Sequence, residues 1–504
     1  MNDVVLHVPA MTQAAYKSTT GWNEFYTIEP LSARPALVVT SRDFVLDIDN
    51  DLTLSNYKPT ITTFRSDWNV ESYGAITVNG NGAVNLSAYN AHYDYNRLYE
   101  SPSSNRHMTS IVNTAALKAD VVNTSLWTRD GKWTFFSLPY DVKVKDIQTL
   151  AEGETNFVIR KYSGENRAMG DMNYTWVKMT ADSTLHANEG YIINTERRVN
   201  NYTQSYSGLG MPSANKGVIL ANNEAKVVLR AYPSEFTQNQ GWNLVGNPYM
   251  CYFDTRYMDF AAPITVWNMR NSSYTAYSPV DDDYILCPGE AFFVQCASAN
   301  QTIIFSKEGR QTDRNARSVS NAKAALATSG DRRIINLSRS DGDRSDITRI
   351  VINENASTSY ELDKDASKFI SEETPQVYSI YNNVHYAINE RPFATGIIPL
   401  GFFVPADGTY TISLGRNSTE EVILVDYETG TEQSIVDAEY SFSAHAGMND
   451  GRFALKFSAG ITTGVHSAED ADKAASTMYN LAGQRIVNDV HGVSIVNGKK
   501  VVNQ

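Results

Sequence analysis

The chain contains few of the residues and motifs that usually mark a chemical activity. Its 504 residues include three cysteines, Cys251, Cys287 and Cys296, which are too few for a disulfide framework and lack the spacing of a metal site. At most one disulfide could form, and we expect the cysteines to be small buried hydrophobic residues. The eight histidines are scattered, and no two lie within five residues of each other, so there is no local pair of metal ligands.

Catalytic motifs are also missing. The sequence has no G-x-S-x-G, H-E-x-x-H or C-x-x-C motif and no P-loop. The stretch "VNGNGAVN" contains Gly80 and Gly82 but lacks the third glycine of a dinucleotide-binding fingerprint, so it predicts a turn. We therefore expect no catalytic residues. An enzyme whose carboxylates come together from distant segments remains an alternative, because such spacing depends on the fold.

Positive charge and long apolar runs are scarce. The formal net charge is -13 and the isoelectric point is about 5.2. This balance argues against a nucleic-acid partner, which requires a basic surface, and against attachment to anionic lipid. No run approaches the roughly 18 apolar residues of a membrane span, so we expect no membrane insertion. The first residues show no signal peptide, so the chain is either cytoplasmic or preceded by an upstream portion.

Two acidic clusters are the only hints of a metal. The segment "DIDND" holds Asp47, Asp49 and Asp51 with Asn50, and resembles the first half of a calcium loop without its glycine and closing glutamate. The other cluster is Asp281–Asp283. We expect both to be solvated acidic turns and expect no cofactor, with calcium as the alternative.

Alternating apolar and polar residues dominate the chain. "TYTISL" places Tyr410, Ile412 and Leu414 on one face, and "RFALKF" alternates in the same way. "AITVNGNGAVNL" predicts two strands on either side of an Asn-Gly-Asn-Gly turn. Helical patterns occur only in "MTQAAYKSTTGW" and "SNAKAALATSG". The predicted fold class is mainly β, with several β-sandwich-like domains in tandem.

An internal repeat lies in the middle of the chain. "KWTFFSLPY" (132–140) and "GWNLVGNPY" (241–249) both place Pro-Tyr six residues after a tryptophan. Further on, "LHANEGYII" (185–193) parallels "LCPGEAFFV" (286–294). Four landmarks in the same order predict two similar β units. In each, we expect the tryptophan (Trp133 and Trp242) to anchor a core strand that ends at a Pro-Tyr corner.

Soft, polar segments suggest the domain boundaries, among them 205–217, 306–333 and 461–476. The expected organisation runs as follows: a cap at 1–31, a β-rich region at 32–120 that is either solenoid-like or a small sheet, a duplicated β module at 121–308 with units at about 121–204 and 218–308, a linker at 309–332, a β-sandwich at 333–460, a linker at 461–476, and a C-terminal hairpin at 477–504.

The segment "VVLHVPAMTQAAYKSTTGWNEFYTIEPL" (4–31) resembles the closing segment of leucine-rich-repeat surface proteins of Bacteroidetes. The resemblance implies a strand ended by Pro9, a short helix around Tyr16, and a plug containing Trp22 and Phe25 that caps a stack of repeats. Since a cap needs repeats to cover, we expect further sequence upstream.

The remainder resembles other parts of the same proteins. The two tryptophan units look like their recurring β modules, and Arg333–Phe457 looks like their final β-sandwich, with Phe442, Phe453, Leu455 and Phe457 in its core. The last segment, "YNLAGQRIVNDVHGVSIVNGKKVV", is similar to C-terminal sorting regions, from which His491 and Ser494 depart. The matching residues are Tyr479, Leu481, Gly483, Gln484, Gly492, Gly498, Lys499 and Lys500.

The resemblance implies a non-enzymatic, adhesin-like protein that lies outside the cell or on its outer surface. We expect it to be a monomer and to bind a host or bacterial surface protein or glycan. The alternative is a carbohydrate-binding accessory protein of a polysaccharide-utilisation system. The sequence predicts no particular ligand-binding residue.

Overall fold

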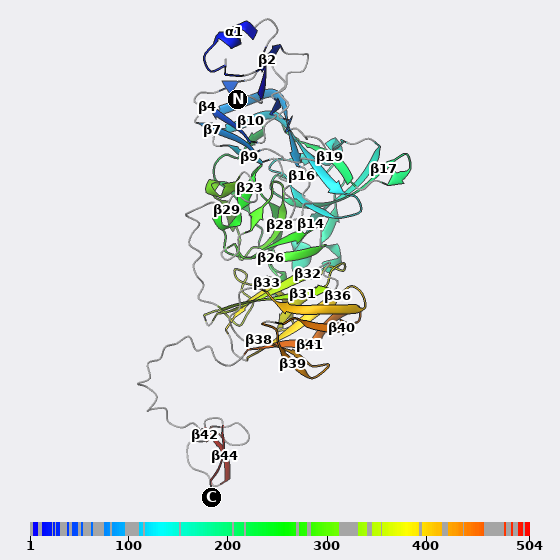
Figure 1. The fold of residues 1–504 in the computed structure, drawn as a ribbon, viewed down its shortest axis with the longest axis vertical. Coiled ribbons are helices and arrows are strands. Elements are labelled where there is room, and N and C mark those ends of the chain that lie inside the picture. The colour runs from blue at the N-terminus through cyan, green and yellow to red at the C-terminus, as the bar shows by residue number, and fades with distance from the viewer. Residues whose placement is uncertain are drawn as a thin grey trace, which may run out of the picture. The chain divides into compact units, whose positions relative to one another are not determined.

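The fold comes from a computed structural model of residues 1–504 (Figure 1). It describes residues 110–311 and 331–457 with gaps at 114–115, 151–152, 204–205, 216–217, 269–271, 280–283, 340–344, 354, 393–395, 416–421 and 437. Outside these ranges it describes the elements named below, two further short strands, and a few turn residues after the first helix. Strands dominate the described residues, so the prediction of a mainly β fold is confirmed.

The N-terminal segment is a strand, a helix and a strand. Strand β1 (Val4–Val8) pairs in parallel with β2 (Thr27–Pro30), and helix α1 (Gln13–Ser18) lies between them in sequence, as predicted. The plug aromatics touch one another: the ring centroids of Tyr16 and Trp22 are 5.4 Å apart, and those of Trp22 and Phe25 are 6.1 Å apart. The second predicted helix, at 320–330, lies outside the described residues.

Parallel strands follow in stacked rows. Strand β7 (Ala75–Gly80) pairs in parallel with β4 (Asp43–Ile48) and with β9 (Ser110–Asn113). Strand β8 (Ala83–Tyr95) pairs in parallel with β5 (Leu52–Thr53) and β10 (Ala116–Arg129). The two strands predicted in "AITVNGNGAVNL" are β7 and β8, and they belong to different sheets rather than pairing with each other. Rows of parallel strands are also the pairing pattern of a β-solenoid.

The two repeat units have the same topology. One sheet has the order β11-β17-β14-β15 and the other the order β22-β28-β25-β26. The bounds are β11 Thr134–Ser137, β14 Glu154–Tyr162, β15 Trp176–Lys178, β17 Gly190–Val199, β22 Trp242–Gly246, β25 Ile264–Asn268, β26 Ser273–Tyr277 and β28 Ala291–Gln295. The registers also correspond, since Ser137 lies opposite Gly190 and Gly246 lies opposite Ala291.

A second sheet completes each unit. In the first unit β19 (Tyr206–Pro212) pairs with β10 and β13 (Gln148–Thr149), and in the second β29 (Thr302–Phe305) pairs with β21 (Ala225–Val228) and β24 (Met258–Asp259). The expectation of a soft segment at 205–217 is therefore wrong over β19. Its glycines suggested a break, but pairing on both edges and the burial of Leu209 and Met211 make it a core strand.

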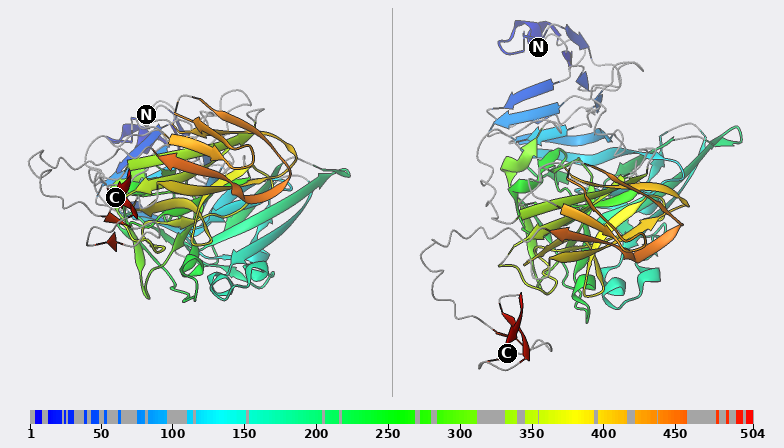
Figure 2. Two further views of the ribbon diagram at one scale, coloured as in Figure 1. Left: turned by 90° about the horizontal axis from the view of Figure 1, so that it is seen from below. Right: turned by 60° about the horizontal axis from the view of Figure 1, so that its bottom comes forward.

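The last large element is an 11-stranded sheet formed by residues 331–457 (Figure 2, yellow to orange). Strands β37 (Gly408–Leu414) and β40 (Tyr440–Ala444) lie at one end of the sheet order, and β41 (Gly447–Phe457) lies near the other. The sheet curls so that these two ends meet. The contact is seen at Phe442 of β40 and Phe453 of β41, whose ring centroids are 4.7 Å apart. The predicted core residues Phe442, Phe453, Leu455 and Phe457 are all buried.

Strands also occupy both ends of the segment that we expected to be a linker at 309–332. Strand β30 (Arg310–Gln311) pairs with β23 (Tyr252–Asp254), and β31 (Asp331–Arg339) enters the large sheet. Residues 312–330 lie outside the described residues.

Residues Ser458–Gln504 form a separate compact unit. Four short strands make one antiparallel sheet in the order β43-β42-β44-β45. Their bounds are β42 Met478–Tyr479, β43 Arg485–Ile486, β44 Gly492–Val496 and β45 Lys499–Asn503. The expected hairpin of this region corresponds to β44 and β45, which pair along their whole length, and two further strands extend it.

Candidate binding cleft between the repeats

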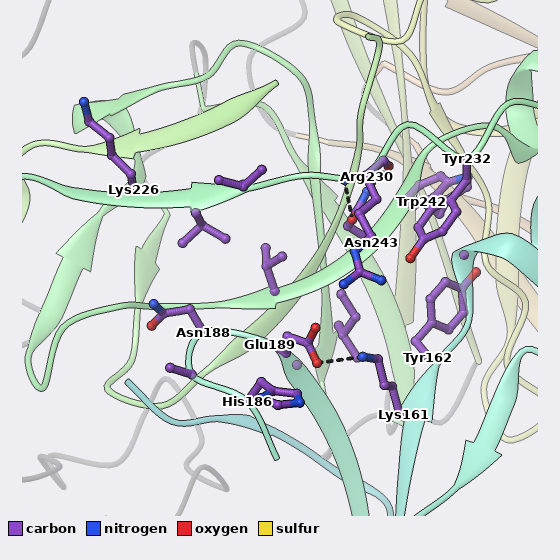
Figure 3. Close-up of a pocket in the computed structure, with 17 residues that line it drawn as sticks. Lys161, Tyr162, His186, Asn188, Glu189, Lys226, Arg230, Tyr232, Trp242 and Asn243 are labelled. Carbon is purple, nitrogen blue, oxygen red and sulfur yellow. Dashed lines mark hydrogen bonds and ion pairs between the residues drawn. The ribbon is translucent and has the colours of Figure 1, made fainter. Parts of the chain in front are cut away.

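A cleft of about 340 Å³ opens where the two repeat units meet; we call it the seam cleft (Figure 3). The first unit contributes the end of β14 and the loop before β17, and the second contributes β21, the segment after it, and β22. The polar and aromatic side chains drawn in Figure 3 are Lys161, Tyr162, His186, Asn188, Glu189, Lys226, Arg230, Tyr232, Trp242 and Asn243. Both repeats are therefore needed to build it.

Reciprocal backbone contacts join the two units beside the cleft. The Ser137 N–H donates to the Gly289 carbonyl at 2.9 Å, and the Gly246 N–H donates to the Asn188 carbonyl at 3.1 Å. Ser137 corresponds to Gly246 in the repeat, and Asn188 corresponds to Gly289. The two units are thus related by an approximate two-fold axis. The hydrogen bond from Gly246 to Asn188 holds the loop bearing Asn188 and Glu189 against β22.

Glu189 lies within a hydrogen-bonded network. Its Oε2 accepts from the Lys161 ammonium at 2.7 Å and from the Tyr191 hydroxyl at 2.8 Å. Partial burial alone would raise the pKa of Glu189, but these two donors outweigh it and lower the pKa. The carboxylate is therefore ionised at neutral pH and acts only as an acceptor.

Arg230 lies across the cleft on a backbone fixed by Asn243. The Asn243 amide accepts the Arg230 N–H at 3.0 Å and donates to the Arg230 carbonyl at 2.8 Å. The Arg230 side chain is exposed. The Tyr232 hydroxyl raises the pKa of the guanidinium, and the charge of Glu189 does so to a smaller extent, so Arg230 remains positively charged.

Tyr232 has a backbone conformation that large residues rarely adopt, with φ of +37°. Its ring packs on Gly164, where a Cβ would come within 2.6 Å of a ring carbon and 2.1 Å of the Trp242 carbonyl oxygen. Only glycine therefore allows this close approach. Strained residues of this kind cluster at functional sites, because the surrounding structure must hold them in place.

The sequence identified the tryptophan in this cleft but not its polar residues. Trp242 was expected to be a core anchor, and at 2% exposure it is one. Lys161, Glu189 and Arg230 come from two repeats and three separate segments, so no local pattern marks them. The strongest available signal was the pairing of "HANEG" with "CPGEA", which places Glu189 in the repeated loop.

A second cleft, of about 620 Å³, lies on the curled sheet of residues 331–457, which we call the terminal sandwich. It lies between the ends of β37, β40 and β41. Its charged side chains are already matched with one another. Arg452 contacts Glu428 at 2.8 Å, and His445 contacts Asp407 at 3.0 Å. The two clefts differ in charge pairing. In the seam cleft, the Arg230 guanidinium has no carboxylate at ion-pair distance among the described residues.

The described residues contain neither a cluster of metal ligands nor a membrane-spanning helix. No group of three or more His, Cys, Asp and Glu side chains is placed to hold a metal ion, and no described helix is long and apolar enough to cross a membrane. The side chains of both acidic clusters lie outside the described residues. Cys251 and Cys296 are buried, as predicted, Cys287 is half-buried, and none of the three forms a disulfide.

The sorting-type residues are described only in part. Tyr479 lies in β42, Gly492 in β44, and Lys499 and Lys500 in β45. Leu481, Gly483, Gln484 and Gly498 lie outside the described residues.

One family model matches part of the chain. It is described as a domain of unknown function (DUF8693) and covers residues 250–457. The matched segment begins within the second repeat unit, after β22, and ends with the last strand of the terminal sandwich. No curated protein and no solved structure matches the chain.

Proposed function

We propose that this protein is a non-enzymatic, adhesin-like binding protein that acts as a monomer outside the cell or on its surface. Its ligand, a host or bacterial surface molecule, binds in the seam cleft. The observation that carries this proposal is the cleft itself, which only the joined repeats create. It is also wide enough for a small ligand or for one projecting group of a larger one.

The electrostatics of the seam cleft support a binding role. The chain as a whole carries a formal net charge of -13, yet the cleft is lined by Lys161, Lys226 and Arg230 against the single carboxylate of Glu189. A local reversal of sign selects ligands by charge complementarity. Glu189 is the one carboxylate that the described residues place in the cleft lining, whereas most glycosidic hydrolysis uses a pair of carboxylates.

The alternative function is a carbohydrate-binding accessory role in polysaccharide use. One observation supports this function: amides, ammonium groups, a guanidinium, a carboxylate and tyrosine rings all line the cleft. Sugar hydroxyls are recognised by such mixtures of donors and acceptors. The external location rests on the resemblance of the two ends of the chain to exported proteins.

Binding of the full-length chain to immobilised matrix proteins, bacterial cells and a glycan array tests both functions. An adhesin for proteins binds the first two and remains silent on the array, whereas the accessory protein binds the array. The cleft variant Glu189→Gln with Arg230→Gln should abolish binding in either case. The control Lys456→Ala, an exposed residue of the terminal sandwich, should not affect it. Undiminished binding by the cleft variant would overturn the assignment of the site.

A further inference from the structure

We infer that the seam cleft binds a sugar residue that carries a carboxylate, with the carboxylate on Arg230 and the ring hydroxyls on Glu189, Lys161 and Asn188. This inference rests on the proposed function and names its ligand class. The observation behind it is that two of the three cations lining the cleft are paired with carboxylates, whereas Arg230 has no carboxylate partner among the described residues.

Two of these cations are already neutralised. The Lys161 ammonium lies 2.7 Å from the Glu189 carboxylate, and the Lys226 ammonium lies 3.3 Å from the Glu224 carboxylate. The Arg230 guanidinium has no carboxylate partner among the described residues; the Tyr232 hydroxyl is the neighbour that affects it most. A guanidinium presents paired N–H donors in a planar fork that matches a carboxylate. Arg230 is therefore the anion-binding group of the cleft.

The remaining polar groups suit hydroxyls better than a second charge. The Glu189 carboxylate accepts hydrogen bonds, the Lys161 ammonium and the Asn188 amide donate them, and all three lie along the same side of the cleft (Figure 3). A ligand with two anionic groups would meet the Glu189 charge and be repelled. A ligand with one carboxylate and several hydroxyls satisfies both sides.

Size and shape also favour a sugar over a protein segment. Sites for small ligands span about 300–1,000 Å³, so a cleft of about 340 Å³ suits one sugar ring better than a long chain. Tyr232 supplies an aromatic wall that is half-buried and held by its contact with Gly164. Trp242 is 2% exposed, so it belongs to the buried cluster behind the cleft and does not contact the ligand.

The test is calorimetric titration of the full-length protein with galacturonate and glucuronate oligosaccharides and with their neutral galactose and glucose counterparts. We expect the acidic oligosaccharides to bind the native protein. Arg230→Gln should weaken this binding by roughly ten- to a hundredfold, the value of a charge-assisted hydrogen bond. Arg198→Gln is the matched control: it removes an exposed arginine that lies outside the cleft lining and is already paired with Glu196, and it should change affinity less than about threefold.

Three outcomes would overturn the inference. Equal binding of acidic and neutral oligosaccharides would remove the role of the carboxylate but leave the cleft as the binding site. Binding of a protein ligand that Arg230→Gln abolishes, with every sugar silent, would also leave the proposed function standing. Binding of acidic sugars that Arg230→Gln leaves unchanged would place the site elsewhere and overturn both. Thermal unfolding of each variant checks that an exposed substitution has not altered the fold.

Discussion

The two tyrosines of the repeated Pro-Tyr corners make equivalent hydrogen bonds. The Tyr140 hydroxyl donates to the Met211 carbonyl at 3.0 Å, and the Tyr249 hydroxyl donates to the Phe305 carbonyl at 2.8 Å. Met211 lies in β19 and Phe305 in β29, which are corresponding strands. The sequence predicted the corner because proline ends a strand, and each tyrosine then fixes where the chain leaves it. The sequence could not show which distant carbonyl each hydroxyl reaches.

A buried carboxyl in the terminal sandwich makes stability depend on pH. Asp365 is 1% exposed, and its two oxygens accept the N–H groups of Glu390 at 2.8 Å and Glu361 at 2.9 Å. Burial nevertheless raises the pKa of Asp365 to about 7, against 3.8 for an ordinary aspartate. The folded state therefore holds this proton more tightly than the unfolded state, so its contribution to stability is present below about pH 4 and is lost as pH rises towards 7.

We therefore expect the free energy of unfolding of the sandwich to fall between about pH 4 and pH 7, with a slope of at most about 1.4 kcal/mol per pH unit. Urea unfolding at a series of pH values measures this slope. Asp365→Asn should flatten the slope. Glu439→Gln, at an exposed carboxyl of the same sandwich, should leave it as in the native chain. An equal slope in native protein and Asp365→Asn would contradict the prediction.

At the scale of elements, the repeat was predictable and its assembly was not. Trp133, Trp242 and the Pro-Tyr pairs repeat at fixed spacing, so they revealed two similar units. The contact between the units depends on Ser137 and Gly246, which differ in size and occupy the same repeat position. A Cβ on Gly246 would lie 2.0 Å from the Ser137 Cβ. The sequence shows that Ser137 and Gly246 differ, but not that they meet. Only the positions of both strands reveal this contact and the cleft beside it.

This contact gives a paired prediction. Gly246→Ala should destabilise the chain by about 1–3 kcal/mol, because the new methyl group overlaps Ser137 and must push β11 and β22, strands of two different sheets, apart. Adding Ser137→Gly removes both atoms that the methyl group would meet most closely, at 2.0 and 2.1 Å, and should restore most of the loss. Chemical unfolding of the two single variants and the double variant gives the coupling between the positions.

The control is Ser137→Gly alone, which should cost less than about 1 kcal/mol, because the Ser137 hydroxyl has no hydrogen-bond partner among the described residues. Additive effects of the two substitutions would show that the strands do not meet as described. Binding should follow the same pattern, since β22, which carries Gly246, also lines the seam cleft.

At the scale of the main compact unit, the terminal sandwich packs against the repeats. Phe369 of the sandwich stacks on Phe293 with a centroid distance of 4.9 Å and contacts Trp242 at 4.8 Å. The Arg167 guanidinium lies over both Trp242 and Phe369, at 4.7 and 4.4 Å from the ring centroids. The sequence suggested domains separated by a linker, because composition reports where polarity rises but not which surfaces meet. The family match, which spans this junction, describes residues from both sides.

Phe369→Ala should uncouple the sandwich from the repeats. The substitution removes a half-buried ring that contacts Trp242, Tyr274 and Phe293, and a loss of about 2–4 kcal/mol is expected for this environment. Because these three partners all belong to the second repeat, the loss falls on the junction between the sandwich and the repeats. Hydrogen exchange should therefore speed up in β26 and β28 and around Phe369, while β37, β40 and β41 remain protected.

Tyr427→Ala provides the matched control, since it removes an aromatic ring from the same sandwich that is 57% exposed. It should change stability by less than about 0.5 kcal/mol and leave exchange at the junction unaltered. If Phe369→Ala lowers protection throughout the sandwich core, Phe369 supports the sandwich itself. If protection at the junction is unchanged, the packing described here does not hold the two parts together. Faster exchange confined to the junction, with ligand binding retained, would show that the seam cleft depends on the joined repeats and not on the sandwich.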